Sequence, residues 1–483
     1  MTLSRLSATI ADGGLGNVQT LDLPPCVVGC SSAGTAATPT RVANPTALIA
    51  AFGYGPMVEA AATLLDLAGG PIVVCKTVSQ TAGALTGLTS GETAAPTPSG
   101  ATPMTCAVTG TPLDKYDVKV KVIRAGATLQ ALTASVRISL DGGTTYGPET
   151  PVPSSGALVI ANTGITITFD DDSDSLQLYA DNVYSFGSTA PAFDATGLAA
   201  ALTACEAAAD TLDHEYVHVV GPINATTFAT VVASATRLRA ASNLRWFLTE
   251  ARDQNSGESV ATWVGVLEGT DPGFAGLTDT LVTVCPAYAT QASRVMPATW
   301  RRPLAWLLSP RFATIPVQQH PGRVRTGAIA GIVTLHHDFN DAALQTLDAQ
   351  RFLGAQTIRG RVGFFATDRT CAATGSDYTS IMRVRVICYA ARVAIAAAGV
   401  FLNEDNDTGE NGTLATRDAD AFDASVDSVL QRELIDQKIT STASARVSRS
   451  EDVLASETLP FVLRFRPRNY AKNITLNLGY TRE

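Results

Sequence analysis

Hydrophobic and polar residues alternate strictly near the C-terminal end of the chain. From Asn473 onward, an apolar side chain occupies every second position, with Thr, Asn or Gly between. A period of two residues is typical of a β-strand with one buried face. Residues 461–466 alternate in the same way, so we predict a strand there as well. The apolar positions of the terminal strand are Ile474, Leu476, Leu478 and Tyr480.

A weaker alternation of the same kind lies near the N-terminal end, where Leu6, Ala8 and Ile10 alternate with Ser7 and Thr9. A strand near the end of a chain can add to a sheet edge in another copy, where backbone hydrogen bonds supply the affinity. It can equally close a sheet of its own chain. The first alternative predicts a subunit of a polymer, and these residues by themselves favour neither.

Further into the chain, helical and strand patterns follow one another. A buried strand is predicted at 26–30, helices at 45–52 and 56–67, and another strand at 71–78. Alternation of helices and strands resumes over 196–285. This order is typical of an α/β domain.

A block of strand patterns separates the two α/β segments. Residues 86–105 are rich in Thr, Ser, Gly, Ala and Pro, which is typical of a linker. Asp141-Gly142-Gly143 then marks a hairpin turn. We predict a small antiparallel, sandwich-like β domain at 101–190, inserted into the α/β domain. Its predicted strands lie at 116–123, 135–140, 165–169 and 183–186.

The last section of the chain predicts a mixed α+β domain. Helices are expected at 342–353, 378–402 and 421–438, with the terminal strands after them. The predicted fold class is therefore a multidomain α/β and α+β chain, whose terminal strands are either exchanged with another copy or paired within the chain. The predicted units are an N-terminal arm (1–20), an α/β domain in two parts (21–100 and 191–337), the inserted β domain (101–190), a C-terminal α+β domain (338–469) and a C-terminal arm (470–483).

Composition narrows the function classes. Of 483 residues, 46% are hydrophobic and only 16% are charged, so the chain can bury a large core. A net charge of −9 argues against a general nucleic-acid binder. No apolar run follows Arg5, and the apolar segment 389–402 is short and interrupted by Arg392. We therefore expect no signal peptide, no membrane insertion and synthesis in the cytoplasm.

The sharpest chemical motif is His214-Glu215-Tyr216-Val217-His218, which matches the H-E-x-x-H pattern of zinc peptidases. That pattern holds one zinc ion only on a helix, where both imidazoles share a face. Here β-branched and aromatic residues follow, and the segment 216–222 is predicted to be a strand. Two histidines four positions apart on a strand are separated by about 13 Å and cannot share one ion. A zinc peptidase is therefore the weakest of the alternatives.

Other patterns fall short of a catalytic or cofactor site. Asp170, Asp172, Asp174 and Asp181 imitate a calcium loop, but Ser175 replaces the required glycine and the flanks are strands. A second acidic loop follows at 403–412. No phosphate-binding glycine loop is complete. We predict no enzymatic activity, no cofactor and no metal.

The cysteines and the basic C-terminal residues leave alternatives open. The eight cysteines are scattered without a CxxC pair, and are expected to be small buried hydrophobes or disulfides formed after assembly. Residues 458–482 carry five basic residues and no acid. We expect this basic strand face to meet acidic protein, a solvated edge being the alternative.

With these features in order, the chain resembles the contractile tail sheath proteins of bacteriophages and related injection machines. The likeness covers most of the chain. It rests on the order of the segments along the chain and on their residue composition, since no single motif is diagnostic. The segments that carry it are 52–56, 69–74, 110–117, 139–143, 215–222 and the C-terminal series of long helix, polar loop, helix and strands.

The resemblance implies a specific assembly. Sheath subunits form six-membered rings stacked helically around a tail tube, and their terminal arms complete a small sheet in adjacent subunits. Contraction drives the tube into a target cell envelope. The implied partners are further copies of this chain, the tail tube protein, and baseplate and tail terminator proteins, in a virion tail assembled in the host cytoplasm. The competing alternative is a static virion or surface structural protein.

The same resemblance assigns roles to residues of this chain. The strand residues near each end become the inter-subunit arms. Arg432, Glu433, Asp436 and Lys438 are expected on the helix that faces the tube. Cys26 and Cys30, near the N-terminal arm, are candidates for disulfides between subunits.

Overall fold

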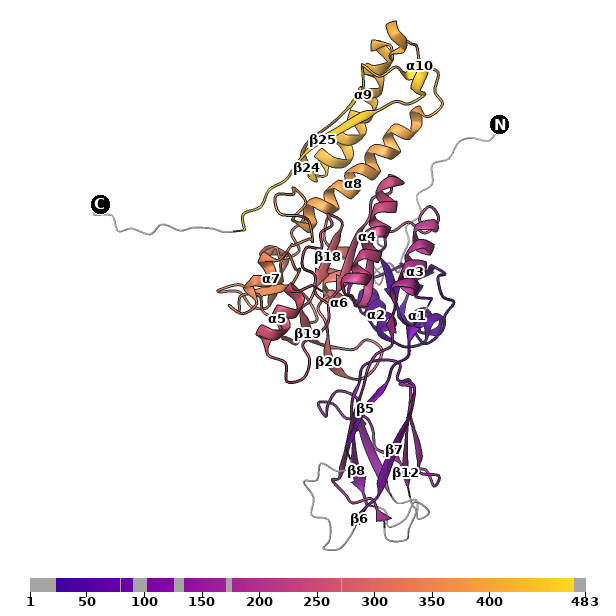
Figure 1. Cartoon of the computed structure of the whole chain (residues 1–483), viewed down its shortest axis with the longest axis vertical. Coiled ribbons are helices and arrows are strands. Elements are labelled where there is room, and N and C mark those ends of the chain that lie inside the picture. The colour runs from indigo at the N-terminus through magenta and orange to yellow at the C-terminus, as the bar shows by residue number, and fades with distance from the viewer. Residues whose placement is uncertain are drawn as a thin grey trace, which may run out of the picture.

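The computed structural model shows an elongated molecule with three regions along its length (Figure 1). A mixed α/β body lies in the middle, two β-sheets extend from one end, and helices with a β-hairpin extend from the other. The chain is thus a mixed α/β, multidomain protein with several sheets. The structure describes residues 23–78, 80–89, 102–125, 134–170, 176–270 and 272–472.

A six-stranded sheet forms the centre of the body, in the order β18-β17-β16-β1-β3-β2. Five of its strands are parallel and β2 is antiparallel. Parallel strands are covered on both faces, which explains their continuous apolar sequences. The strands are β1 (Cys26–Gly29), β2 (Thr40–Val42), β3 (Ile72–Lys76), β16 (Tyr216–Pro222), β17 (Trp246–Glu250) and β18 (Val282–Cys285).

Helices cover both faces of this sheet. Along β1, Val27 packs with α2 and Trp306, whereas Cys26 and Val28 pack with α3 and α4 on the other face. Asn44 and Asn224 cap α1 and α4 by accepting a backbone N–H of the first turn. The helices of the body are α1 (Pro45–Phe52), α2 (Pro56–Ala68), α3 (Ala195–Ala207), α4 (Ala225–Ala240), α5 (Val260–Glu268) and α6 (Ala305–Thr314).

Two antiparallel sheets enclose a separate core at the lower end in Figure 1. Their orders are β10-β9-β8-β14-β5 and β11-β12-β7. The segment 86–105, predicted as a linker, includes four of the five residues of β5 and all of β6, so it contributes to the strands of this region. The strands are β5 (Leu85–Thr89), β7 (Thr105–Gly110), β8 (Asp117–Arg124), β9 (Ser135–Ser139), β10 (Thr150–Pro151), β11 (Ala157–Ile160), β12 (Ile165–Asp170) and β14 (Val183–Ser188), with the short pairs β6 (Thr102–Pro103) with β13 (Leu176–Gln177) and β4 (Gln80–Thr81) with β15 (Ala192–Phe193).

A buried ionic cluster joins these sheets to the body. The guanidinium of Arg302 lies 3.2 Å from both Glu59 Oε2 and Asp114 Oδ2, and it stacks on the Trp300 ring. Trp300 Nε1 donates to Glu59 Oε1 at 2.5 Å. Burial raises the pKa of Asp114 to about 7; Arg302 opposes this rise and Glu59 adds to it. One cation thus faces two carboxyl groups at the junction.

The region after β18 contains short elements and then the upper end of the molecule in Figure 1. The helix predicted at 342–353 is only five residues long, because Arg351 adopts a left-handed conformation (φ 75°) that ends it. The elements are β19 (Tyr288–Ala292), β20 (Thr299–Pro303), η3 (Val324–Thr326), β21 (Thr334–Leu335), α7 (Gln345–Ala349), β22 (Ala355–Thr357), β23 (Phe364–Ala366), α8 (Ile381–Ala398), η4 (Gly399–Phe401), η5 (Glu410–Gly412), α9 (Thr416–Leu430), the π-helical turn η6 (Gln431–Asp436), β24 (Thr440–Val447), α10 (Val453–Ser456) and β25 (Phe461–Pro467).

Helix α8 links the body to the upper region. The segment Ile381–Phe401 is long and apolar enough, by length and composition, to cross a membrane. About a third of this segment is buried. Its N-terminal half contacts the body: Arg385 is buried, its Nε lies 2.8 Å from Glu215 Oε1, and its guanidinium donates to the Phe312 carbonyl of α6. The C-terminal half of α8 packs against α9.

Candidate assembly interface

Strands β24 and β25 form a two-stranded antiparallel hairpin beside α8 and α9. Phe461, Leu463 and Phe465 of β25 lie half-buried toward the helices, whereas Val462 and Arg464 point to solvent. This is the period-two pattern predicted for 461–466. A hairpin on its own offers two sheet edges at which a further strand could add.

Helix α9 occupies the outer edge of β24. Asp427 Oδ1 accepts the backbone N–H of Ala445 at 2.8 Å, and Asp423 Oδ1 accepts that of Val447 at 2.8 Å. Arg446 bonds both Asp427 and the Ala445 carbonyl. Residues 423 and 427 are one helical turn apart, so both carboxylates point at the same strand. This edge cannot pair with another strand until α9 moves.

The outer edge of β25, called the free edge below, pairs with no strand among the described residues. Ala445 pairs with Leu463 in the ladder and Val447 pairs with Phe461. Because the amides of Ala445 and Val447 point away from β25, the peptide groups of their partners point away from β24. The peptide groups of Phe461, Leu463 and Phe465 make no hydrogen bond with any residue that the structure describes. The hairpin therefore presents one strand-accepting edge.

An apolar strip borders the free edge. Three half-buried side chains of β25 face the helix layer, and Tyr389 and Val393 of α8 are half-buried in the same cluster. The apolar area of these side chains that stays in water would be stabilised by about 25 cal/mol for each Å² if another strand covered it. A strand added to the free edge with apolar side chains on its inner face would cover this strip. The hairpin thus offers both the hydrogen bonds and the contact surface for such a strand.

After β25 the chain continues into residues 468–472, called the arm root below, which is fastened to the body. The carboxylate of Asp368 is 3% exposed and accepts hydrogen bonds from Tyr470 Oη, from Ser380 Oγ at 2.6 Å and from Lys472 Nζ at 2.5 Å. His320 lies against the Tyr470 ring, with the ring centroids 4.7 Å apart. Burial raises the pKa of Asp368, but the His320, Lys472 and Ser380 groups outweigh it and hold the pKa below its usual value. Asp368 is therefore an anion at neutral pH.

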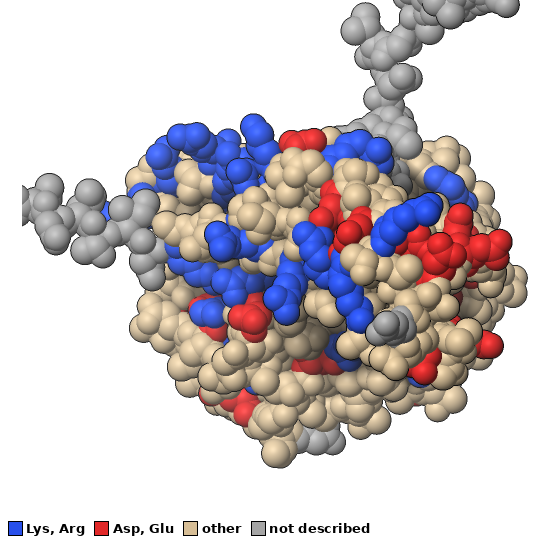
Figure 2. Space-filling view, turned by 90° about the horizontal axis from the view of Figure 1, so that it is seen from above, with Lys and Arg blue, Asp and Glu red and all other residues tan. Residues whose placement is uncertain are grey.

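An open groove of about 990 Å³ runs beside the arm root. It is lined by both basic and amide side chains, among them Arg323, Arg468 and Gln356. Figure 2 shows that Lys and Arg gather over much of the molecule's upper face, with Asp and Glu grouped at one side. Arg464, Arg466 and Arg468 form no ion pair within the described part of the chain. The basic strand face predicted from the sequence is present, and its acidic partner stays a prediction.

The predicted arm and tube residues have different outcomes. The N-terminal arm residues (Leu6, Ala8, Ile10) and the C-terminal arm residues (Ile474, Leu476, Leu478, Tyr480) lie outside the described residues. Arg432, Glu433 and Asp436 lie in η6, and Lys438 follows it with exposed side chain. Arg432 Nε is 2.8 Å from Glu433 Oε1. Their role in facing a tube stays a prediction.

The cysteines are buried. Cys26 and Cys30 are 0% and 2% exposed, and Cys26 Sγ lies 3.6 Å from Cys205 Sγ within the body. Burial raises the pKa of the Cys30 thiol to about 11, which keeps it protonated. A disulfide between subunits would need both thiols at the surface. The structure therefore favours the alternative of small buried hydrophobes.

The H-E-x-x-H motif has a structural role. His218 lies in β16, as predicted, and its Nε2 is 3.0 Å from Glu250 Oε1 inside the core. His214 is buried ahead of the strand, and Glu215 pairs with Arg385. Burial lowers the pKa of His214 to about 4. The three side chains face separate partners, so this motif cannot assemble a zinc site in this fold.

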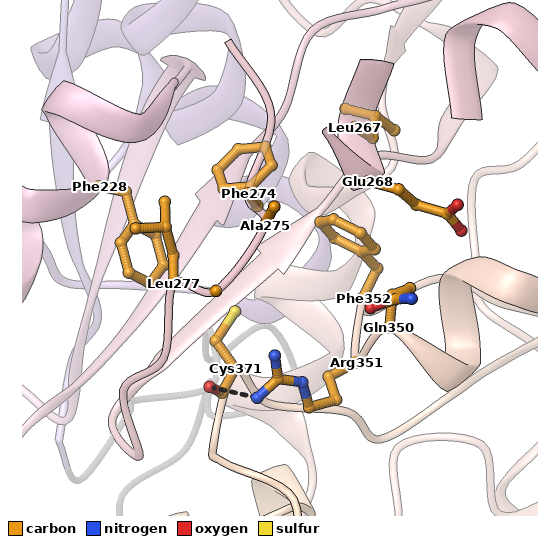
Figure 3. A pocket seen from close by; sticks show the side chains of 11 residues that line it. Phe228, Leu267, Glu268, Phe274, Ala275, Leu277, Gln350, Arg351, Phe352 and Cys371 are labelled. Atoms are coloured by element: carbon orange, nitrogen blue, oxygen red, sulfur yellow. Dashed lines mark hydrogen bonds between the residues drawn. The ribbon is translucent and has the colours of Figure 1, made fainter. Parts of the chain in front are cut away.

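The first acidic loop and a small internal hollow are the remaining candidate sites for a metal or a reactive group. Residues 171–175 of the first acidic loop lie outside the described residues, and the described part of the chain contains no cluster of three potential metal ligands. Figure 3 shows the hollow, where Phe228, Phe274 and Phe352 surround the Cys371 thiol. Its volume of about 20 Å³ has room for roughly one water molecule. Burial raises the pKa of Cys371 to about 12, which keeps the thiol protonated at neutral pH.

Comparison with solved structures identifies the class of fold. The contracted helical sheath of the anti-feeding prophage matches with a TM-score of 0.53 at 12% identity, over 99% of both chains. The contracted sheath of the extracellular contractile injection system PVC matches with a TM-score of 0.54 at 8% identity, over 99% of this chain and 98% of that one. A chain of the anti-feeding prophage baseplate matches with a TM-score of 0.53 at 12% identity, over 100% of this chain and 99% of that one.

The chain therefore has the fold of the sheath proteins of contractile injection systems, and the predicted resemblance is confirmed. Residues 3–370 match the family described as DUF2586, N-terminal domain. The protein belongs to the DUF2586 family. No curated protein matches the chain.

Proposed function

We propose that the protein is the structural subunit of a contractile sheath. Copies of the chain would polymerise as stacked six-membered rings around a tail tube, and contraction of the stack would drive the tube into the envelope of a target cell. The proposal rests on the sheath fold and, above all, on the free edge of β25. An edge that is unpaired among the described residues, next to a half-buried apolar strip, is what a strand from another copy requires.

Strand exchange would be carried by the predicted C-terminal arm. Its alternating Ile474, Leu476, Leu478 and Tyr480 would place four apolar side chains on the strip between α8 and β25, with Thr475 and its neighbours outward. The predicted N-terminal strand would extend the same sheet. A tether of this kind keeps subunits linked while their surfaces repack, so contraction becomes a rotation of linked bodies.

The sheath would also contact non-identical partners. The exposed charges of η6, with Lys438 beside them, would face the tail tube, and baseplate and terminator proteins would bind the ends of the stack. The complex would lie in a tail structure assembled in the host cytoplasm. Substituting Arg432→Glu with Lys438→Glu should weaken co-sedimentation with the tube protein while self-assembly persists. Unchanged tube binding would remove η6 from this role.

Electron microscopy of arm variants tests the proposal. Leu476→Asp with Leu478→Asp should abolish tubular polymers, because two charges would be forced onto an apolar strip. The matched control, Thr475→Asp with Asn477→Asp, adds the same charges to the opposite face of the predicted strand and should still polymerise. If a chain lacking residues 473–483 forms tubes as the full chain does, the arm is not the link. A static surface or capsid protein would form no contractile tubes with either variant.

A further inference from the structure

Two C-terminal arms could occupy the free edge of a given copy: the arm of another copy, and the arm of the same chain. Only five residues, 468–472, separate the end of β25 at Pro467 from the predicted strand that begins at Asn473. Loops of four or five residues join antiparallel strands in many hairpins. The arm of each copy could therefore fold back on its own β25, cover its own apolar strip and leave nothing to donate.

The length of the connection makes this competitor strong. A short flexible linker gives an effective concentration in roughly the millimolar range. At a protein concentration of about 10 µM, pairing within one chain would be favoured over pairing between chains by about a hundredfold. A free arm root would thus bias the monomer toward a closed form. Something in the chain has to oppose the turn.

We infer that Asp368 is a latch that holds the arm root away from β25 and so directs the arm to another copy. The inference rests on the proposed strand exchange. Tyr470 and Lys472 are residues that a fold-back turn would need, and both are bonded to Asp368 on the body. The residues after Pro467 would have to give up these two bonds to Asp368 before they could form the turn.

The latch is built into rigid structure. Ser380, at the start of α8, donates to the same carboxylate, and Ile381 N–H donates to the Asp368 carbonyl at 2.8 Å. The aspartate is therefore positioned by the body whether or not the arm root is bound. Two hydrogen bonds from the arm root to a buried anion shift an equilibrium by roughly tenfold to a hundredfold, after allowance for a Lys472 side chain that is 44% exposed. This effect of the two bonds is comparable to the preference of about a hundredfold for pairing within one chain, which the bonds have to oppose.

The experiment removes the arm-root half of the latch in the full chain. Tyr470→Phe with Lys472→Gln should close the monomer, so that the amides of Phe461, Leu463 and Phe465 exchange at least tenfold more slowly below the assembly threshold. The concentration needed for assembly should rise about tenfold. Lys472→Arg, which keeps the charge, should restore both values. Arg468→Gln should leave the exchange of the three amides unchanged, because Arg468 has no ion pair among the described residues.

Deletion of residues 473–483, with and without the double substitution, separates this inference from the proposed function. The double variant that also lacks residues 473–483 should lose the slow exchange, which would assign the protection to the chain's own arm. If the double variant exchanges and assembles like the wild type, while deletion of 473–483 alone stops assembly, the latch is refuted and strand exchange stands. If the deletion alone assembles normally, strand exchange itself is refuted, and the latch with it.

Discussion

A proline placed in β25 should separate assembly from folding. The amide of Leu463 points outward at the free edge, whereas the amide of its neighbour Arg464 points inward, in the ladder with Ser444. Leu463→Pro therefore removes a donor that the hairpin does not use. Arg464→Pro is the matched control, because it removes a ladder donor one position away.

The expected magnitude follows from the number of groups lost. The free edge offers the peptide groups of three residues, Phe461, Leu463 and Phe465, and each strand hydrogen bond contributes about 0.5–1.5 kcal/mol. Leu463→Pro removes one donor, and its ring displaces an incoming strand, so one or two bonds are lost. The loss is about 0.5–3 kcal/mol per contact, and the assembly concentration should rise by roughly twofold to 150-fold. The monomer should lose about 1 kcal/mol from the half-buried Leu463 side chain.

Light scattering and thermal unfolding together give the readout. We expect Leu463→Pro to keep a near-native unfolding transition and to fail to scatter at concentrations where the wild type assembles. Arg464→Pro should lower the unfolding transition itself, because it removes a ladder donor and leaves its acceptor unpaired, at a cost of about 1–3 kcal/mol. If Leu463→Pro is folded and assembles at the wild-type concentration, no strand adds to the free edge.

Three further predictions concern the support of the hairpin, the junction and the thiols. Asp427→Ala leaves the Ala445 amide without a partner, so thermal unfolding should show a loss of about 1–2 kcal/mol and scattering should reveal irregular aggregates; regular tubes of normal stability would contradict this. Because burial raises the pKa of Asp114 from 3.8 to about 7, the folded state holds a proton that the unfolded state releases, and stability should fall between pH 4 and 7 by up to about 1.4 kcal/mol per pH unit. In Asp114→Asn the denaturation midpoint should depend less on pH over that range. The same pH dependence as in the wild type would contradict the raised pKa of Asp114. Non-reducing electrophoresis of assembled particles should give monomeric bands, since Cys26 and Cys30 are buried, and a dimer band lost in Cys26→Ser would contradict this.

Local periodicity predicted much of the secondary structure. The strands predicted at 116–123 and 183–186 are found as β8 and β14, because alternation there is strict and one face is buried. The strand predicted at 216–222 from its β-branched and aromatic residues is found as β16, which contains His218 but not His214. The helix at 342–353 was predicted too long, since nothing local signals the left-handed Arg351. The helix predicted at 421–438 starts earlier, at Thr416, and ends in a π-helical turn.

The interface depends on contacts that the sequence does not signal. The latch joins Asp368 to Lys472 across more than one hundred residues, and no local pattern marks either residue. The choice between the two hairpin edges depends on where α9 lies, which is a matter of tertiary packing. One signal was available: Asp423 and Asp427 are four residues apart on a predicted helix and so share a face. That spacing indicates a common partner but does not identify β24.

An electron cryomicroscopy map of the assembled protein tests the strand exchange most directly. We predict continuous density for residues 474–480 as a strand on β25 of a different copy, with Leu476 and Leu478 on the strip between α8 and β25 of that copy. Density that leads the same residues back to β25 of their own chain, or leaves β25 unpaired in the polymer, would contradict it.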